Sequence, residues 1–126
     1  MSPAALSLYD ASGLSPADKV QPGALSRLLA AAAQDPRFGP LLSGLPISGF
    51  DGTLAKRYRT STAAGEVRAK TGTLSGVSAL AGLVRTHDGA VLAFAFTANG
   101  IPVSGTLRAQ AALDRLATAL ADCGCR

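Results

Sequence analysis

Four consecutive residues in the middle of the chain have side chains and backbone suited to binding a small anionic group. They are Lys70, Thr71, Gly72 and Thr73. The lysine supplies a positive charge for a carboxylate, and the threonines supply hydroxyls and backbone N–H groups for a carboxylate or an oxyanion. The glycine lets a ligand approach the backbone closely. A Lys-Thr-Gly triplet alone is also compatible with a turn that carries a solvated lysine, so its context has to decide.

Other polar residues are weaker candidates for chemistry. Ser12 precedes a glycine, but no Gly-x-Ser-x-Gly pattern surrounds it and no base stands beside it, which favours a turn serine. His87 is the sole histidine and falls in a predicted hairpin turn, which disfavours a Ser-His-Asp triad or a metal site built on it. Asp10 and Asp51 could form a carboxylate pair, but turn and cap roles explain both.

The two cysteines do not form a convincing metal site. Cys123 and Cys125 lie at the C-terminus, and zinc prefers about four ligands where the chain has one histidine. We therefore predict no metal and expect the cysteines to lie in a frayed tail.

The elements that must position the Lys-Thr-Gly stretch change character along the chain. The first 21 residues look irregular, and Pro22 then starts an amphipathic helix over 22–34, with Leu25, Leu28, Leu29 and Ala32 on its apolar face. Short helical turns are expected over 36–42 and 53–58, separated by a glycine-rich loop. The second half predicts an extended segment over 65–71, strands over 77–85 and 90–99, and a helix from Ser104 whose apolar face includes Leu113, Leu116 and Leu120.

The last predicted strand is apolar without alternation over residues 90–96. Such a strand is usually covered on both faces and central in its sheet. In a simple meander of three strands, however, this strand would lie at an edge, where a long apolar segment is an aggregation hazard. This conflict indicates that a neighbouring strand comes from sequence outside this chain.

Length and composition place the chain among folded proteins, with 126 residues enough for one domain and not two. The hydrophobic fraction is 48%, the charged fraction is 16% and the net charge is +4. The basic residues are scattered, apart from one cluster, which disfavours nucleic-acid binding and suits an anionic small substrate or cell-wall polymer. We find no run of about 20 apolar residues and no signal peptide. The basic cluster is Lys56, Arg57, Arg59, Arg68 and Lys70.

Four segments in the same order resemble the low-molecular-mass class C penicillin-binding proteins. Gly65–Gly82 resembles the strand that carries their third motif, and the resemblance covers about residues 7–122. Ala11 stands where the family usually has glycine. The other segments are Tyr9–Ser15, Asp35–Phe38 with Leu45–Gly49, and Asp51–Leu54.

The resemblance implies a fold and an activity. The fold would be α/β, the second half of a penicillin-binding transpeptidase/beta-lactamase-like domain, with an antiparallel sheet of about three strands flanked by helices. The family are serine-type D-Ala-D-Ala carboxypeptidases that also act as endopeptidases on peptidoglycan peptides through an acyl-enzyme. Beta-lactams would acylate the same serine, no cofactor is implied, and the parent protein would work on the extracytoplasmic side of the membrane.

The family's chemistry also needs a Ser-x-x-Lys motif and a Ser-x-Asn motif, which are absent here. Thr53–Lys56 has the first spacing but a threonine, and Asn99 has no serine two residues before it. The resemblance therefore carries over only to the third motif. It implies a catalytic and carboxylate-binding Lys70, a carboxylate contact from Thr71, close backbone approach at Gly72 and an oxyanion N–H from Thr73.

Without a nucleophile the isolated chain is expected to be inactive. A truncated reading frame is one interpretation of this. A non-catalytic module that retains a carboxylate-binding strand is a second. A third is a piece that complements a separately encoded N-terminal half, which would then be its partner.

Overall fold

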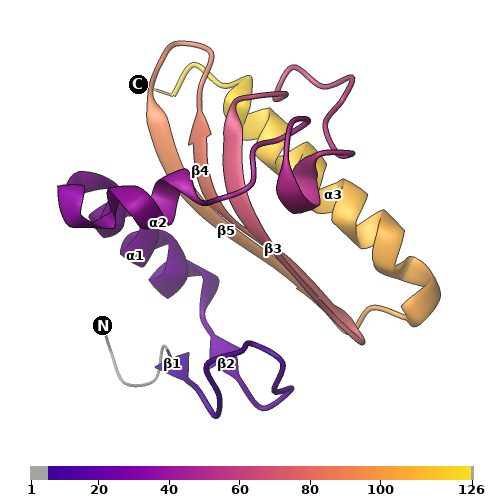
Figure 1. The fold of residues 1–126 in the computed structure, drawn as a ribbon. Helices are drawn as coiled ribbons and strands as arrows, with labels where there is room; N and C mark the ends of the chain where they lie inside the picture. The colour runs from indigo at the N-terminus through magenta and orange to yellow at the C-terminus, as the bar shows by residue number, and fades with distance from the viewer. Residues whose placement is uncertain (1–5, 126) are drawn as a thin grey trace.

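An antiparallel sheet of three strands forms the centre of the computed structural model, which describes residues 6–125 (Figure 1). The strands β3 (Val67–Leu74), β4 (Val77–Arg85) and β5 (Val91–Asn99) follow one another in the sheet as they do in the chain. Helix α1 (Pro22–Gln34) packs against β5 and β4, and helix α3 (Thr106–Ala121) packs against the opposite face. This confirms the predicted α/β architecture.

The face under α3 holds the hydrophobic core. Residue pairing along the sheet brings odd-numbered residues of β3 onto the same face as even-numbered residues of β4 and β5. These positions are apolar over most of their length, so α3 can bury them. The buried residues of this core include Val67, Ala69, Leu80, Val84, Phe94, Leu113, Ala117 and Ala121.

The face under α1 is lined by small residues instead, namely Ala79, Ala81, Ala93 and Ala95. Helix α1 meets it with alanines, since Ala24 and Ala32 are its buried residues. Small side chains let a helix lie close to a sheet, so the larger Leu28 is turned outward and is 52% exposed. The prediction that Leu28 belongs to the buried face was therefore wrong, and so was that for Leu116 of α3, which is 50% exposed.

The N-terminal part is more regular than predicted. Residues expected to be irregular form a small ribbon of β1 (Leu6–Ser7) and β2 (Lys19–Val20). Between these strands the Asp10 carboxylate accepts hydrogen bonds from three backbone N–H groups, which holds the turn. The remaining short helical elements are η2 (Pro36–Phe38), α2 (Gly39–Ser43), η3 (Gly52–Leu54) and η4 (Val103–Gly105).

Strand β3 continues to Leu74, three residues beyond the predicted end of the extended segment at Thr71. The break falls instead at Gly76, whose φ of 79° a side chain would strain. Residues 70–73 therefore belong to the strand and pair with β4. At the other side of the sheet β5 is an edge strand, as the meander predicted, and its first residue, Val91, is 61% exposed.

Strands β3 and β4 approach most closely at Gly82. A Cβ added there would lie 2.0 Å from the Arg68 carbonyl oxygen and 2.6 Å from the Ala69 Cα. Because both atoms belong to the backbone, no side-chain rotation could relieve the overlap. Gly82 therefore sets the position of the strand that carries Lys70–Thr73. None of the helices within residues 6–125 has the length and apolar composition to cross a membrane.

Candidate anion-binding strand

The outer edge of β3 is covered over its first half and open over its second half. The Ser48 N–H donates to the Val67 carbonyl at 2.9 Å, and the Ala69 N–H donates to the Pro46 carbonyl at 3.0 Å. These bonds join the segment before η3 to the start of β3. Beyond Ala69 no described strand pairs with this edge, so the half that contains Lys70–Thr73 is open.

The same bonds show which backbone groups point outward. In an antiparallel pair, alternate residues direct their N–H and C=O groups toward one side. Val67 and Ala69 direct theirs away from β4, so Thr71 and Thr73 do so as well. Within the described chain no acceptor is found for the Thr73 N–H. It is therefore available to an oxyanion or to an added peptide strand.

Lys70 lies on the other face from the core, where α1 covers β4 and β5. Its side chain is exposed, and its Nζ donates to the Thr71 carbonyl at 2.7 Å. The ammonium group thus bends from the open face toward the open edge. No described carboxylate forms a salt bridge with it, so an anion at this edge would meet a positive charge that no described carboxylate neutralises.

The hydroxyls of Thr71 and Thr73 lie on the α3 face and are each held by a neighbour. Thr71 Oγ1 donates to Thr53 Oγ1 of η3 at 3.1 Å, and Gln110 Nε2 of α3 donates to Thr73 Oγ1 at 3.3 Å. Thr53 and Gln110 were not identified as site residues from sequence. They are 18 and 37 residues away from their partners, and no local motif signals such contacts.

Gly72 is exposed, and nothing within residues 6–125 requires a glycine there. Its φ is outside the left-handed region. A Cβ added at this position would meet only the Ala79 Cβ, at an ordinary distance of 3.5 Å. Glycine in a strand interior weakens the strand, so its presence at an open edge is consistent with a ligand that needs close approach.

The segment that carries Thr53 is anchored to α3. Arg57 forms a two-point ion pair with Asp114, with nitrogen–oxygen distances of 2.8 and 2.5 Å, and both side chains are largely buried. This pairing neutralises one member of the predicted basic cluster. The neighbouring Tyr58 is buried with φ at 63°, and burial, together with the Asp114 carboxylate, raises the pKa of its phenol far above the usual value.

The polar residues considered as alternatives lie in structural roles. Ser12 Oγ donates to the Asp10 carboxylate at 3.0 Å within the N-terminal turn. The Asp51 carboxylate accepts from the Ile47 N–H at 2.6 Å, which closes the turn before η3. His87 is exposed in the β4–β5 turn, and its backbone N–H donates to the Ala121 carbonyl at 2.7 Å. The side chains of Ser12, Asp51 and His87 form no hydrogen bond with the edge of β3 within residues 6–125.

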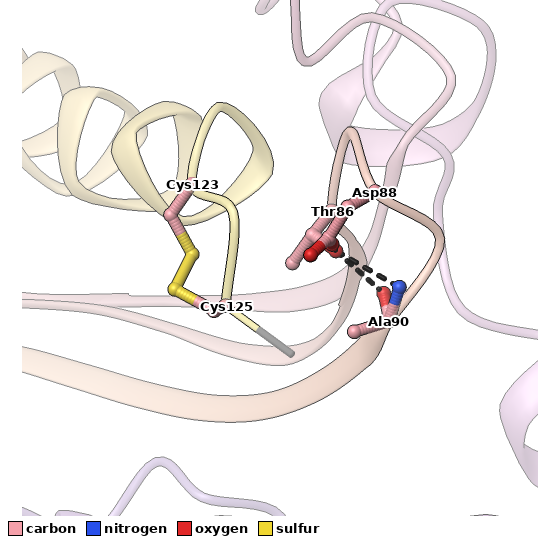
Figure 2. Close-up of a disulfide and its surroundings, with 5 residues drawn as sticks. All are labelled: Thr86, Asp88, Ala90, Cys123 and Cys125. Carbon is pink, nitrogen blue, oxygen red and sulfur yellow. Dashed lines mark hydrogen bonds between the residues drawn. A yellow bond between two sulfur atoms is a disulfide. The ribbon is translucent and has the colours of Figure 1, made fainter.

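The C-terminal cysteines are joined rather than frayed. Cys123 and Cys125 form a disulfide just after α3, with their Cα atoms 5.3 Å apart (Figure 2). The β4–β5 turn, where Thr86 Oγ1 bonds the Ala90 backbone, is drawn in the same view. The expectation of a frayed tail was therefore wrong for these residues. No group of three or more metal-ligating side chains is found within residues 6–125.

Comparison with known proteins gives a consistent picture. The sequence profile of the D-Ala-D-Ala carboxypeptidase 3 (S13) family matches residues 1–120. Carboxypeptidase DacB of Mycolicibacterium smegmatis is 42% identical over 124 residues, which is 94% of this chain and 26% of that protein. A D-alanyl-D-alanine carboxypeptidase of an Actinomadura species is 40% identical over 124 residues, covering 94% of this chain and 22% of the relative. The chain thus spans about a quarter of the length of these relatives.

Solved structures agree in fold. Penicillin binding protein 4 (dacB) of Haemophilus influenzae superimposes with a TM-score of 0.71 at 35% identity, over 75% of this chain and 21% of that one. The same protein in complex with a beta-lactam superimposes with a TM-score of 0.72 at 34% identity, over 77% and 23%. The sheet and its flanking helices are therefore part of a penicillin-binding protein fold.

Proposed function

Because the chain belongs to the D-Ala-D-Ala carboxypeptidase 3 (S13) family, we propose that it supplies the substrate-binding strand of a serine-type D-Ala-D-Ala carboxypeptidase/endopeptidase. Residues 1–126 would be one partial domain, the C-terminal portion of the peptidase domain. The nucleophile motif would belong to another part of the parent protein. The isolated chain would then bind substrate without cleaving it.

The observation that carries the proposal is the exposed Gly72 on the open half of β3. Neither the backbone conformation nor packing against the described part of the chain requires glycine there. The residue also lies between a cation that has no carboxylate partner and a backbone N–H that has no described acceptor. A ligand that pairs with the strand edge and carries a negative charge would account for all three features.

Each residue of the stretch would have a distinct role. Lys70 would hold the terminal carboxylate of the peptide electrostatically and take part in proton transfer, while Thr71 would contact that carboxylate. The Thr73 N–H would donate to the oxyanion of the tetrahedral intermediate. Gly72 would leave room for the substrate backbone. Together these groups would orient the D-Ala-D-Ala bond along the open edge of β3.

The chemistry would follow from a serine oxygen supplied by the missing part of the parent. That oxygen would attack the carbonyl carbon of the D-Ala-D-Ala bond, and its proton would pass to the leaving amine as the carbon–nitrogen bond breaks. Water would then hydrolyse the acyl-enzyme. The reaction exchanges one acyl group between oxygen and nitrogen and needs no redox or metal cofactor.

The family suggests the partners and the location of the parent. Peptidoglycan peptides that end in D-Ala-D-Ala would be the substrates, and the parent would act on the extracytoplasmic side. Beta-lactams would acylate the parent's serine, in keeping with the beta-lactam complex of the Haemophilus influenzae protein.

A second candidate role is that of a complementing module. The apolar β5 has an open edge, and its exposed Val91 would be covered if a strand from a separate N-terminal half paired with it. In that case coexpression with such a half would restore acylation by penicillin. Failure of the two chains to copurify would remove this candidate.

The proposed function is tested by two measurements on the purified chain. In an NMR titration, N-acetyl-D-Ala-D-Ala is expected to shift the backbone signals of residues 70–73, whereas the L,L dipeptide is not. Intact-mass spectrometry after incubation with excess penicillin is expected to show no adduct. Shifts spread over the whole surface would refute the site, and a stoichiometric adduct abolished by prior denaturation would show that this chain has its own activated nucleophile.

A further inference from the structure

The hydroxyl of Thr71 is not free to bind a ligand in this structure. Its Oγ1 donates its proton to Thr53 Oγ1 at 3.1 Å. A hydroxyl has one proton to donate and can accept two hydrogen bonds. The proton of Thr71 is therefore used within the chain, and the proton of Thr53 is the one that remains available at this point of the open edge.

Thr53 is exposed, and no acceptor for its hydroxyl proton is found within residues 6–125. Its oxygen already accepts from Thr71, which polarises the O–H bond and makes it a better donor. A carboxylate is the strongest acceptor that such a donor can meet. The geometry thus favours an anionic group bound by Thr53 and supported by Thr71 behind it.

The turn that carries Thr53 is rigid, so its hydroxyl is held in place before any ligand arrives. The next residue, Leu54, is fully buried, and its carbonyl accepts from the Gly49 N–H at 3.0 Å. Gly52 has a φ of 53°, and a Cβ there would lie 2.9 Å from the Pro46 ring. A preorganised donor loses less entropy on binding than a mobile one.

The same turn is fixed to the strand that it serves. The Pro46 carbonyl accepts from the Ala69 N–H at 3.0 Å, two residues before Thr71 on the same side of β3. The Asp51 carboxylate closes the turn by accepting from the Ile47 N–H. The spacing between η3 and the open edge is therefore set by the fold.

We infer that Thr53 is a further binding residue: its hydroxyl donates directly to the terminal carboxylate of the peptide, and Thr71, aligned behind it, acts on that carboxylate through Thr53 rather than by the direct contact proposed above. This assignment rests on the proposed function, because it names a new contact in the same site. Lys70 would approach the carboxylate from the other face of the strand. The two faces of β3 would then contribute a charge and a hydroxyl to one anionic group.

The test compares two peptides on four versions of the full chain. N-acetyl-D-Ala-D-Ala has the carboxylate, and its C-terminal amide lacks it, so the ratio of their dissociation constants from NMR titrations reports carboxylate recognition. The variants are Thr53→Val, Thr53→Ser and the control Thr62→Val, an exposed threonine whose side chain forms no hydrogen bond within residues 6–125. Amide spectra of each variant establish that it is folded.

Thr53→Val is expected to weaken acid binding about tenfold or more while leaving amide binding unchanged, because one charge-assisted hydrogen bond is lost. Thr53→Ser should restore the wild-type ratio, and Thr62→Val should match the wild type. An unchanged ratio in Thr53→Val would overturn the assignment, and so would an equal weakening of both peptides, which indicates a merely structural role. A wild-type chain that binds neither peptide would overturn the proposed function itself and the assignment with it.

Discussion

Replacing Gly72 with alanine should raise the stability of the chain and lower its affinity for a ligand. The exposed glycine has an ordinary strand conformation, and a methyl group there would contact only the Ala79 Cβ at 3.5 Å. Alanine therefore fits without strain. It also reduces the conformational freedom of the unfolded chain, which glycine leaves large.

The expected gain is about 0.4–1 kcal/mol in the free energy of unfolding. For a domain of this size it corresponds to a rise in melting temperature of roughly 2–4 °C. The added methyl group would stand on the Lys70 face of the strand, where a bound peptide has to approach. Overlap of that kind costs about 1–3 kcal/mol, so the affinity for N-acetyl-D-Ala-D-Ala should fall by about 5- to 150-fold.

Thermal unfolding followed by circular dichroism measures the first effect, and NMR titration with the dipeptide measures the second. A gain in stability together with a loss of affinity is the informative result, because replacing a glycine that folding requires would make the chain less stable. A Gly72→Ala chain that is less stable than the wild type, or that binds the dipeptide equally well, would refute the reasoning.

Gly82 provides the contrast within the same sheet. A Cβ there would overlap the Arg68 carbonyl oxygen at 2.0 Å, so β3 would have to move away from β4 by about 1.5 Å to reach ordinary contact. We expect Gly82→Ala to lower the free energy of unfolding by about 3 kcal/mol or more. In thermal unfolding followed by circular dichroism, the cooperative transition should be broadened or lost. A stable Gly82→Ala chain would show that the sheet can separate at this point at little cost.

Three further predictions concern parts of the molecule away from the strand edge. Asp114→Asn should lower the free energy of unfolding by about 1–3 kcal/mol in urea titrations, because it leaves a largely buried arginine without its carboxylate; no loss would show that the pair is dispensable. A hydrogen bond from Arg85 lowers the pKa of Glu66 below its ordinary value of 4.5. The small stabilisation from this ion pair is therefore fully present at pH values above 4.5, and it is lost as the pH falls through the lowered pKa of the folded state. The melting temperature of Glu66→Gln should therefore fall less at acidic pH than that of the wild type. Identical profiles of melting temperature against pH for the two chains would contradict this role of the ion pair. Replacing both Cys123 and Cys125 with serine should lower the free energy of unfolding by no more than about 1.6 kcal/mol, since the disulfide closes a loop of only three residues. A larger loss in thermal unfolding would show that the disulfide contributes more to stability than loop closure explains.

Much of the fold followed from local sequence patterns. The bounds of α1 and β4 agree with the prediction because their signals are local: a proline at the first turn of α1, and an aspartate–glycine hairpin turn after β4. The meander order also indicated the edge position of β5 correctly, whereas the apolar run of that strand is typical of a central one. The ribbon of β1 and β2 was missed because two-residue strands have no periodicity to detect.

The candidate site could be predicted only in part, for a different physical reason. The Lys-Thr-Gly stretch is contiguous, so its residue types alone pointed to an anion. The hydroxyl partners Thr53 and Gln110 are brought to it by folding, and nothing in their own neighbourhoods distinguishes them from other polar residues. The outward faces of Leu28 and Leu116 were misjudged because helical periodicity alone does not tell which of two neighbouring apolar stripes will face the sheet.

The order of strands in the meander has a consequence for how the chain folds. Both strand pairs are hairpins between neighbours in the chain, and α3 follows β5 after a short connection, whereas α1 lies far upstream of the strands that it covers. Contacts between neighbouring segments form fastest, because little chain entropy is lost on closing short loops. The sheet and α3 are therefore expected to assemble first, and α1 to dock last. The strand that carries Lys70–Thr73 would belong to the early unit, with slow amide exchange along its bonds to β4 and faster exchange in α1.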